Sequence, residues 1–253
     1  MLLECRSLDV SVGDRQLIRG LTLSVGAGHL LAVLGPNGAG KTLLMHTLAG
    51  MRPPAGGAIL IRGRSLDLWS KRDLAREMAL LPQNVEDPFP ATVLETVLLG
   101  RHPHISRWRW ENAEDVALAR DAIASVGLQG YEERDVFTLS GGERRRAAIA
   151  AVFAQAPTIF LMDEPTNHLD PSHQLEALKL LRQRADAGAA VIVTIHDANL
   201  AARFADQALL IEPRGAWTWG DSAQTINDDN LSRLYSTRFE SLERDGRRIF
   251  FQA

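Results

Sequence analysis

A glycine-rich loop directly after an apolar stretch is the first feature of the sequence that could do chemistry. Residues 30–34 (LLAVL) are all apolar, and the segment after them matches G-x-x-x-x-G-K-[ST]. Its glycines let the backbone adopt positive φ and approach phosphate oxygens closely, its lysine places a charge near the β- and γ-phosphates, and its threonine hydroxyl can ligate Mg²⁺. The nucleotide-binding residues predicted here are Gly35, Pro36, Asn37, Gly38, Ala39, Gly40, Lys41, Thr42 and Leu43.

A pair of carboxylates follows a second apolar stretch, at residues 159–162 (IFLM). Asp163 and Glu164 come next in the chain, and successive side chains of a strand point in opposite directions. We therefore expect Asp163 to face Mg²⁺ and Glu164 to orient and deprotonate a water. A third apolar stretch, at residues 189–195, is followed by His196, which we expect at the same carboxyl edge of the sheet.

A second glycine pair lies a hundred residues after the first loop, in LSGGERRRAAIA at residues 139–150. It precedes a predicted helix, and a helix N-terminus favours an anion through its free N–H groups and its dipole. The sequence therefore contains two turns suited to phosphate, and one nucleotide site needs only one of them.

The composition limits the class of protein. The chain has 253 residues, 45% of them hydrophobic, so it can bury a large core, and its net charge of −3 predicts no binding to nucleic acid. The one cysteine, Cys5, is expected to be a small buried apolar residue. The apolar stretches are shorter than the ~20 residues of a membrane span, and Glu4 and Arg6 interrupt any signal peptide, so we expect a cytoplasmic chain.

The order of apolar and amphipathic segments predicts the fold class. Strands buried on both faces alternate with helical patterns at residues 116–128 and 173–188, as in α/β folds with a mostly parallel sheet.

Six motifs in this order resemble the ATP-binding subunits of ABC transporters: GPNGAGKT, Gln83 in LLPQN, LSGGE, IFLMDEP, NHLD and His196. The resemblance implies a RecA-like P-loop NTPase core, with an N-terminal antiparallel β subdomain and an inserted helical subdomain. It also implies a head-to-tail homodimer, in which a signature motif caps the γ-phosphate of ATP held by Lys41 of the other chain. The signature residues are Ser140, Gly141, Gly142 and Glu143.

The resemblance assigns further roles. Glu164 would be the general base, His196 would contact the γ-phosphate and the attacking water, and Gln83 would sense Mg²⁺ and the transport partner. Asp170 in NHLD would help each subunit respond to the state of the other subunit's ATP site. The magnesium ligands would be Thr42, Gln83 and Asp163.

The sequence departs from the family pattern at two places. Many members stack adenine on an aromatic residue where this chain offers Val12, so base recognition is left open. Many members also have Gln-Arg-Gln-Arg where this chain has Glu-Arg-Arg-Arg at residues 143–146, which we interpret as a solvated helix face with one or two ion pairs.

The segment VLLGRHPHISRWRW, at residues 97–110, resembles the GR-x-PH segment of ATPases that serve importers of vitamin B12, iron-siderophores and haem. In those proteins this region is a helical subdomain that receives a separate membrane permease. Trp108 and Trp110, beside Arg107 and Arg109, suit either such a contact or the core of the subdomain. His102 and His104 lack the further ligands that a metal site needs.

The predicted organisation is a single ABC ATPase domain. Residues 1–83 form the β subdomain and the first part of the core, 84–157 the helical subdomain, 158–213 the rest of the core, and 214–253 a short C-terminal extension, with a small helix and a hairpin around Asp245-Gly246. We expect a bacterial importer ATPase, peripheral on the cytoplasmic face of the inner membrane, with a periplasmic binding protein as an indirect partner. Cobalamin or a ferric siderophore is the expected cargo.

Three alternatives remain open. A haem importer ATPase would differ only in cargo. A soluble ABC-type ATPase of DNA repair or the ribosome would keep the ATP chemistry, but such proteins usually carry a long coiled coil or two motif sets. A P-loop small-molecule kinase would share GPNGAGKT but would have no use for LSGGE.

Overall fold

The computed structural model describes residues 1–84, 90–106, 110–244 and 246–253, and a six-stranded sheet organises them. The sheet order is β10-β9-β3-β8-β7-β6, and each neighbouring pair is parallel except β10 with β9. Its strands are β3 (Leu30–Leu34), β6 (Met78–Leu81), β7 (Ile159–Met162), β8 (Ala190–Thr194), β9 (Gln207–Ile211) and β10 (Trp217–Asp221). The three apolar stretches of the sequence are thus neighbouring central strands, and the α/β expectation is confirmed.

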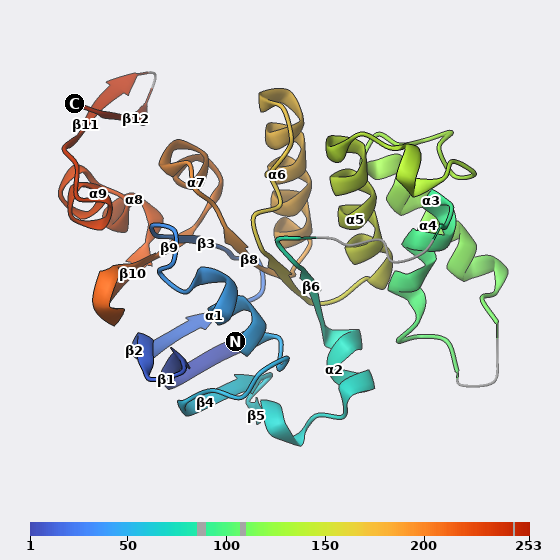
Figure 1. Cartoon of the computed structure of the whole chain (residues 1–253), viewed down its shortest axis with the longest axis horizontal. Helices are drawn as coiled ribbons and strands as arrows, with labels where there is room; N and C mark the ends of the chain where they lie inside the picture. The colour runs from blue at the N-terminus through green and yellow to red at the C-terminus, as the bar shows by residue number, and fades with distance from the viewer. Residues whose placement is uncertain (85–89, 107–109, 245) are drawn as a thin grey trace.

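Helices cover both faces of this sheet, which explains why its central strands carry apolar residues without alternation. Alternate residues of β3 enter two different cores: Leu30 packs in one with α6 (Pro171–Asp186), and Leu31 in the other with α1 (Lys41–Leu48). Figure 1 shows α6 and α7 (Ala198–Phe204) on one side of the sheet and α1 on the other. A strand in this position has no solvated face on which a polar side chain would be favoured.

The N-terminal part forms a separate antiparallel sheet of order β2-β1-β4-β5. Its strands are β1 (Leu3–Val12), β2 (Arg15–Val25), β4 (Gly56–Ile61) and β5 (Arg64–Ser65). Cys5 lies in its buried face, where burial raises the pKa of the thiol to about 12. The predicted antiparallel β region and the apolar role of Cys5 are both confirmed.

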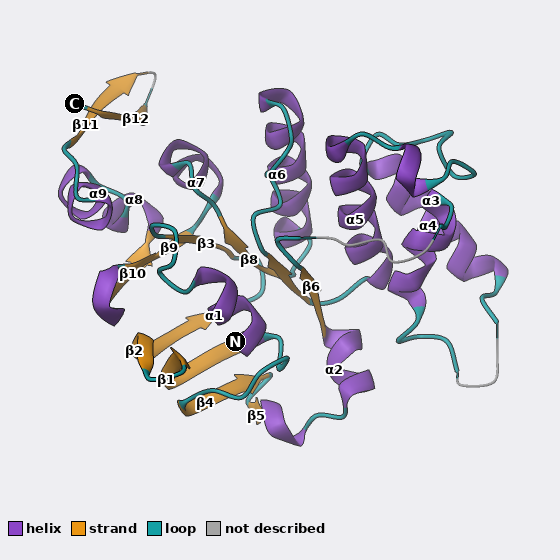
Figure 2. Cartoon of the chain, viewed as in Figure 1, coloured by secondary structure: helices purple, strands orange, loops and turns teal. Residues whose placement is uncertain are grey.

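A group of helices lies at one end of the molecule, beyond α6 (Figure 2). They are α3 (Val93–Leu98), α4 (Ala113–Ser125) and α5 (Gly141–Gln155), and they share one apolar core with the neighbouring face of the main sheet. The helix expected at residues 116–128 begins earlier because Asn112 caps it and forms a capping box with Asp115. The remaining helices before α6 are α2 (Lys71–Glu77) and three short 3-10 helices at Leu66–Leu68, Leu99–Arg101 and Val136–Thr138.

The GR-x-PH segment holds the C-terminal end of α5. Arg101 pairs with the Asp115 carboxylate at 2.9 Å and donates to the carbonyl of Ala154 at 2.8 Å, while Nε2 of His104 lies 2.8 Å from the carbonyl oxygen of Gln155. These are the last carbonyls of the helix, which have no partner within it. Both side chains therefore have a structural task as helix caps.

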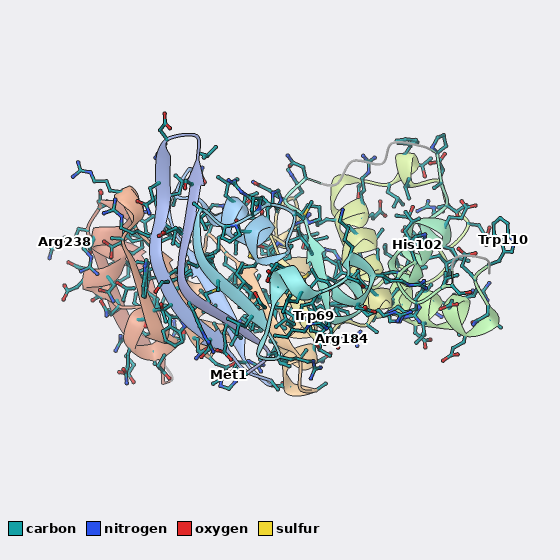
Figure 3. The ribbon with its side chains drawn as sticks, turned by 90° about the horizontal axis from the view of Figure 1, so that it is seen from below. Met1, Trp69, His102, Trp110, Arg184 and Arg238 are labelled. Atoms are coloured by element: carbon teal, nitrogen blue, oxygen red, sulfur yellow. The ribbon has the colours of Figure 1, made fainter. Side chains whose placement is uncertain are left out.

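Trp110 does not pack in the helical core, because 89% of its surface is exposed. Figure 3 shows it at one end of the molecule, with Arg238 at the opposite end. This exposure excludes the role of Trp110 in the core of the helical subdomain and leaves its role in a contact with a partner. Arg107, Trp108 and Arg109 lie outside the described residues.

The C-terminal segment divides into two parts. We assigned all of residues 214–253 to an extension, but β10 pairs along its whole length with β9 and continues the main sheet. Beyond it come α8 (Ser222–Thr225), α9 (Asp228–Tyr235) and the hairpin β11 (Phe239–Arg244) with β12 (Arg247–Gln252); a further 3-10 helix, Pro213–Gly215, precedes β10. A small helix followed by a hairpin is what the sequence predicted, although Asp245 of its turn is outside the described residues. In the part of the chain that the structure describes, no helix has the length and apolarity needed to cross a membrane.

Candidate nucleotide-binding and catalytic site

The phosphate loop joins β3 to α1, at the carboxyl edge of the main sheet. Gly38 and Gly40 adopt φ of 77° and 105°, a region that side chains rarely tolerate, as the sequence predicted. Gly35 has no positive φ and is needed for a different reason: a Cβ there would lie 2.7 Å from the carbonyl oxygen of Ile211. The expectation of a positive φ is therefore wrong at Gly35, where close packing against β9 requires the glycine.

Lys41 is the first residue of α1, and its ammonium folds back over the loop. Nζ donates to the carbonyl of Gly35 at 2.7 Å and to that of Pro36 at 3.2 Å. Burial lowers the pKa of Lys41, and the charges of Glu164 and Asp163 oppose this shift. A buried ammonium that is hydrogen-bonded by two neutral carbonyl oxygens is placed to form a charge-assisted contact with a phosphate.

Asp163 directly follows β7 and is completely buried. Its Oδ1 accepts a hydrogen bond of 2.7 Å from the hydroxyl of Thr194, whereas its buried Oδ2 has no hydrogen-bond partner. Thr42, at the start of α1, donates from its hydroxyl to Oε1 of Gln83 at 3.3 Å. An orphaned carboxylate oxygen together with hydroxyl and amide oxygens is the donor set that Mg²⁺ prefers, so these residues fit the ion.

Glu164 follows Asp163 and adopts φ of 50°, an unusual value for a residue other than glycine, and one that often marks a functional position. Its carboxylate is buried and surrounded by three polar side chains. Nε2 of Gln83 donates to it at 3.0 Å, Nε2 of His196 lies 2.7 Å from its Oε1, and Asn167 donates from its side-chain amide. The structure thus brings Gln83, Glu164 and His196 together, although they come from three different parts of the sequence.

The signature residues stand apart from this group. Ser140 caps α5 and forms a capping box with Glu143. The Ser140 hydroxyl accepts from the Glu143 N–H at 3.2 Å, and the Ser140 N–H donates to the Glu143 carboxylate at 2.8 Å. Ser140 and Gly141 are exposed. Figure 1 shows α6 between α5 and the part of the molecule that contains α1, and the side chain of Ser140 hydrogen-bonds with Glu143 rather than with a residue of the phosphate loop.

Asp170 lies at the start of α6 and is exposed to solvent. It caps the helix by accepting from the backbone N–H of His173 at 3.0 Å, and its other oxygen lies 2.7 Å from Nδ1 of His173. The hydrogen bond from the His173 N–H, with those from the side chains of Ser172 and His173, holds the pKa of this carboxyl well below its usual range. Asp170 therefore stays ionised at the surface. The segment before it approaches the signature motif, because a Cβ on Gly142 would lie 3.3 Å from the carbonyl oxygen of His168.

Sequence reasoning missed three residues of the site. Thr194 was concealed within an apolar strand, yet its hydroxyl donates to Asp163 and accepts the backbone N–H of Glu164 at 2.7 Å. Asn167 was treated only as part of NHLD. Arg145 was assigned to a solvated face, which is wrong, because only 4% of it is exposed and its guanidinium donates to four backbone carbonyls. The one sequence signal for Arg145 is that residues 143–146 depart from the family's Gln-Arg-Gln-Arg pattern.

A cavity of about 500 Å³ adjoins the phosphate loop. Its lining includes three arginines, Arg15, Arg19 and Arg214, and neither an aromatic residue nor Val12 is among the described residues that line it. It also includes Pro36, Asn37, Gly38 and Ala39 of the loop. The space beside the phosphate loop therefore offers guanidinium groups as possible contacts for the base, in place of the aromatic ring that many family members have at the position of Val12.

Comparisons with known proteins agree with this geometry. The family model described as ABC transporter matches residues 18–167. The chain is 40% identical to the hemin import ATP-binding protein HmuV of Streptomyces coelicolor, over 92% of this chain and 82% of that protein. It is 35% identical to the iron(3+)-hydroxamate import ATP-binding protein FhuC of Bacillus subtilis, over 92% and 87%.

Two further proteins extend the comparison. The chain is 35% identical to the cobalamin import ATP-binding protein BtuD of Halobacterium salinarum, over 94% of this chain but only 60% of that longer protein. Among solved structures, an inward-facing ABC transporter of the metal-chelate type superposes with a TM-score of 0.86 at 26% identity, covering 100% of this chain and 96% of that one. The chain therefore belongs to the ABC transporter family, as one of its ATP-binding subunits with ATPase activity.

Proposed function

We propose that this chain is the ATPase subunit of a bacterial importer for a metal chelate, and that it works as a homodimer with two shared ATP sites. The observation that carries the proposal is the division of the machinery. Gln83, Glu164 and His196 share hydrogen bonds and Lys41 feels the charge of Glu164, whereas the exposed Ser140 and Gly141 hydrogen-bond with none of these side chains in the described part of the chain. A second copy of the chain, placed head to tail, would complete each site.

The proposed reaction is the attack of a water on the γ-phosphate of ATP. Glu164 accepts the proton of the water as its oxygen bonds to phosphorus, and the bond between the γ-phosphorus and the bridging oxygen of ADP breaks. His196, 2.7 Å from the Glu164 carboxylate, orients that carboxylate and the water. Lys41 and the loop N–H groups stabilise the charge on the phosphate oxygens.

Mg²⁺ would be held by Asp163, Thr42 and Gln83, and when bound it neutralises charge on the β- and γ-phosphates. The unpartnered Oδ2 of Asp163 supports this assignment. The side chain of Gln83 hydrogen-bonds with both Thr42 and Glu164, so a movement of Gln83 at the magnesium site would also move the Glu164 carboxylate.

The signature would act on the nucleotide of the other subunit. Ser140 and Gly141 expose the N-terminus of a helix of fifteen residues, where N–H groups and the dipole favour the γ-phosphate. Asp170, ionised at the surface nearby, would contact the partner subunit. ATP would then hold the dimer closed, and hydrolysis would release it.

The helical region, which we propose as a subdomain at residues 84–157, would receive the permease. Leu99 is 70% exposed and Leu68, on the adjoining part of the core, is 61% exposed. Together with the exposed Trp110 they offer apolar surface to a partner. The chain would thus be peripheral on the cytoplasmic face of the inner membrane, and a periplasmic binding protein would reach it only through the permease.

The cargo is proposed as cobalamin or a ferric siderophore, with haem as the alternative. The relatives named for these three cargoes are 35–40% identical to the chain, a spread too narrow to separate them. Cargo contacts would lie on other subunits of the importer.

The experiment that tests the proposal has two parts. The purified chain should hydrolyse ATP with a rate that rises as the square of protein concentration when it is dilute, because two chains build each site; strictly linear dependence would contradict the shared site. A strain lacking the gene should then lose uptake of one of labelled cobalamin, ferric hydroxamate or haem, and normal uptake of all three would contradict the importer assignment.

A further inference from the structure

Arg145 makes an unusual set of contacts in the second turn of α5. Its Nη1 donates to the carbonyl oxygens of Pro82 at 2.7 Å and Gln83 at 3.2 Å. Its Nη2 donates to those of Asp163 at 2.6 Å and Glu164 at 2.8 Å. One buried side chain therefore joins the signature helix to the backbone of both segments that carry the magnesium ligands and the general base.

The charge of this side chain persists despite its burial. Burial lowers the pKa of Arg145 to about 10, and the nearby charges of Asp163 and Glu164 oppose the shift, so the guanidinium remains a cation at neutral pH. Its four bonds go to carbonyl oxygens, which leaves both carboxylates free for the reaction. A planar fork of donors can fix two backbone segments at once, which a single ammonium cannot do.

We propose that Arg145 is a positioning residue that links the two ATP sites of the dimer, by fixing Gln83 and Glu164 of one site to the helix whose first turn serves the other. This inference rests on the proposed shared site, because only there does Ser140 act on the partner's nucleotide. Arg145 lies five residues after Ser140, about 7.5 Å along the helix. A shift of α5 as the dimer closes would therefore move the backbone at Gln83 and Glu164.

The alternative is that Arg145 only stabilises the fold, and Arg146 supplies a matched control for it. Arg146 is the next residue of α5 and also donates to two backbone carbonyls, of Val126 and Gly127, each at 3.2 Å. Those carbonyls belong to the segment after α4 and have no place in the nucleotide site. Loss of either guanidinium removes hydrogen bonds from α5 to backbone carbonyls, but only loss of Arg145 releases the segments of Gln83 and Glu164.

The test compares Arg145→Gln, Arg145→Lys and Arg146→Gln with the unmodified protein. Nucleotide affinity is measured on the monomer, and kcat and the Hill coefficient for ATP are measured by steady-state hydrolysis. In Arg145→Gln we expect kcat to fall at least about tenfold and the Hill coefficient to fall from near 2 toward about 1, with affinity changed less than about twofold. Arg145→Lys, which keeps the charge but cannot bridge four carbonyls, should behave in the same way, whereas Arg146→Gln should keep the cooperativity.

The results separate the two proposals. Linear, non-cooperative hydrolysis by the unmodified protein would contradict the shared site itself. If the unmodified protein is cooperative and Arg145→Gln retains its Hill coefficient, or changes it no more than Arg146→Gln does, the linking role of Arg145 is overturned. Should Arg145→Gln fail to fold, Arg145→Lys decides the question by the same two readouts, and if neither folds, a purely structural role is established and the proposal fails.

Discussion

The two glycine turns that precede helices, at residues 35–42 and 139–143, differ in what each contacts within its own chain. The first carries a buried lysine, adjoins a cavity of about 500 Å³ and is joined through Thr42 and Gln83 to Glu164, the proposed general base. The second is closed by a capping box, and its serine is exposed. Both can present N–H groups to an anion, and the first adds a buried lysine and an adjoining cavity. The comparison teaches that a helix N-terminus becomes a site through what surrounds it.

The largest expected effect comes from Glu164→Gln, which removes the base and keeps the size of the side chain. Hydrolysis should fall by about 10²–10⁴-fold, while ATP binding persists. ATP that is not hydrolysed would keep the first turn of one subunit joined to the second turn of the other. An ATP-dependent dimer should therefore accumulate, as measured by size-exclusion chromatography with light scattering. A monomer that hydrolyses ATP normally would contradict both the base assignment and the shared site.

Lys41→Ala removes the counter-charge that distinguishes the first turn. ATP affinity should fall by about a hundredfold, since a charge-assisted contact with phosphate contributes up to about 3 kcal/mol. Titration calorimetry on the monomer measures this directly. Arg182→Gln is a suitable control, because Arg182 also donates to a backbone carbonyl, that of Gly28, but lies far from the loop in sequence. If Lys41→Ala and the unmodified chain bind ATP with equal affinity, the charge of Lys41 does not distinguish the first turn from the second.

Ser140→Arg tests the second turn in the opposite way. ATP affinity of the monomer should change less than about twofold, whereas hydrolysis should be lost because a long side chain replaces Ser140 at the γ-phosphate of the site that this turn completes. An equal mixture with Lys41→Ala should then recover about a quarter of the original sites, since each mixed dimer has one site free of both changes. A mixture that stays inactive, with mixed dimers shown to form, would argue against action between subunits.

The smallest effect is expected for Thr194→Val, which keeps the shape of the side chain and removes the hydroxyl between Asp163 and Glu164. The buried Asp163 carboxylate and Glu164 N–H lose their partner, so unfolding free energy should fall by about 1–3 kcal/mol. The Mg²⁺ concentration required for half-maximal hydrolysis should rise severalfold, as Asp163 is held less firmly. Denaturant unfolding and a magnesium titration check the two effects, and an unchanged magnesium requirement would limit Thr194 to a structural role.

The phosphate loop, the carboxylate pair and the central strands could be predicted because local sequence determines them. Residues 30–34 and 159–162 are strands at the predicted positions, since uninterrupted apolar runs suit only a sheet covered on both faces. The reason for Gly35 could not be predicted, because the clash it avoids is with Ile211, far away in the sequence. The same holds for β10, whose place in the main sheet depends on its pairing with β9.

The sequence by itself determined which residues could bind phosphate and magnesium, because those tasks depend on residue type and on spacing within a few positions. Only the tertiary structure decided which of them meet. It brought Gln83, Glu164 and His196 together, left Ser140 exposed in a capping box, and buried Arg145 among four carbonyls. The physical reason is that backbone carbonyls, burial and charge partners come from distant segments, so a run of charges such as 143–146 has no fixed meaning until the chain folds around it.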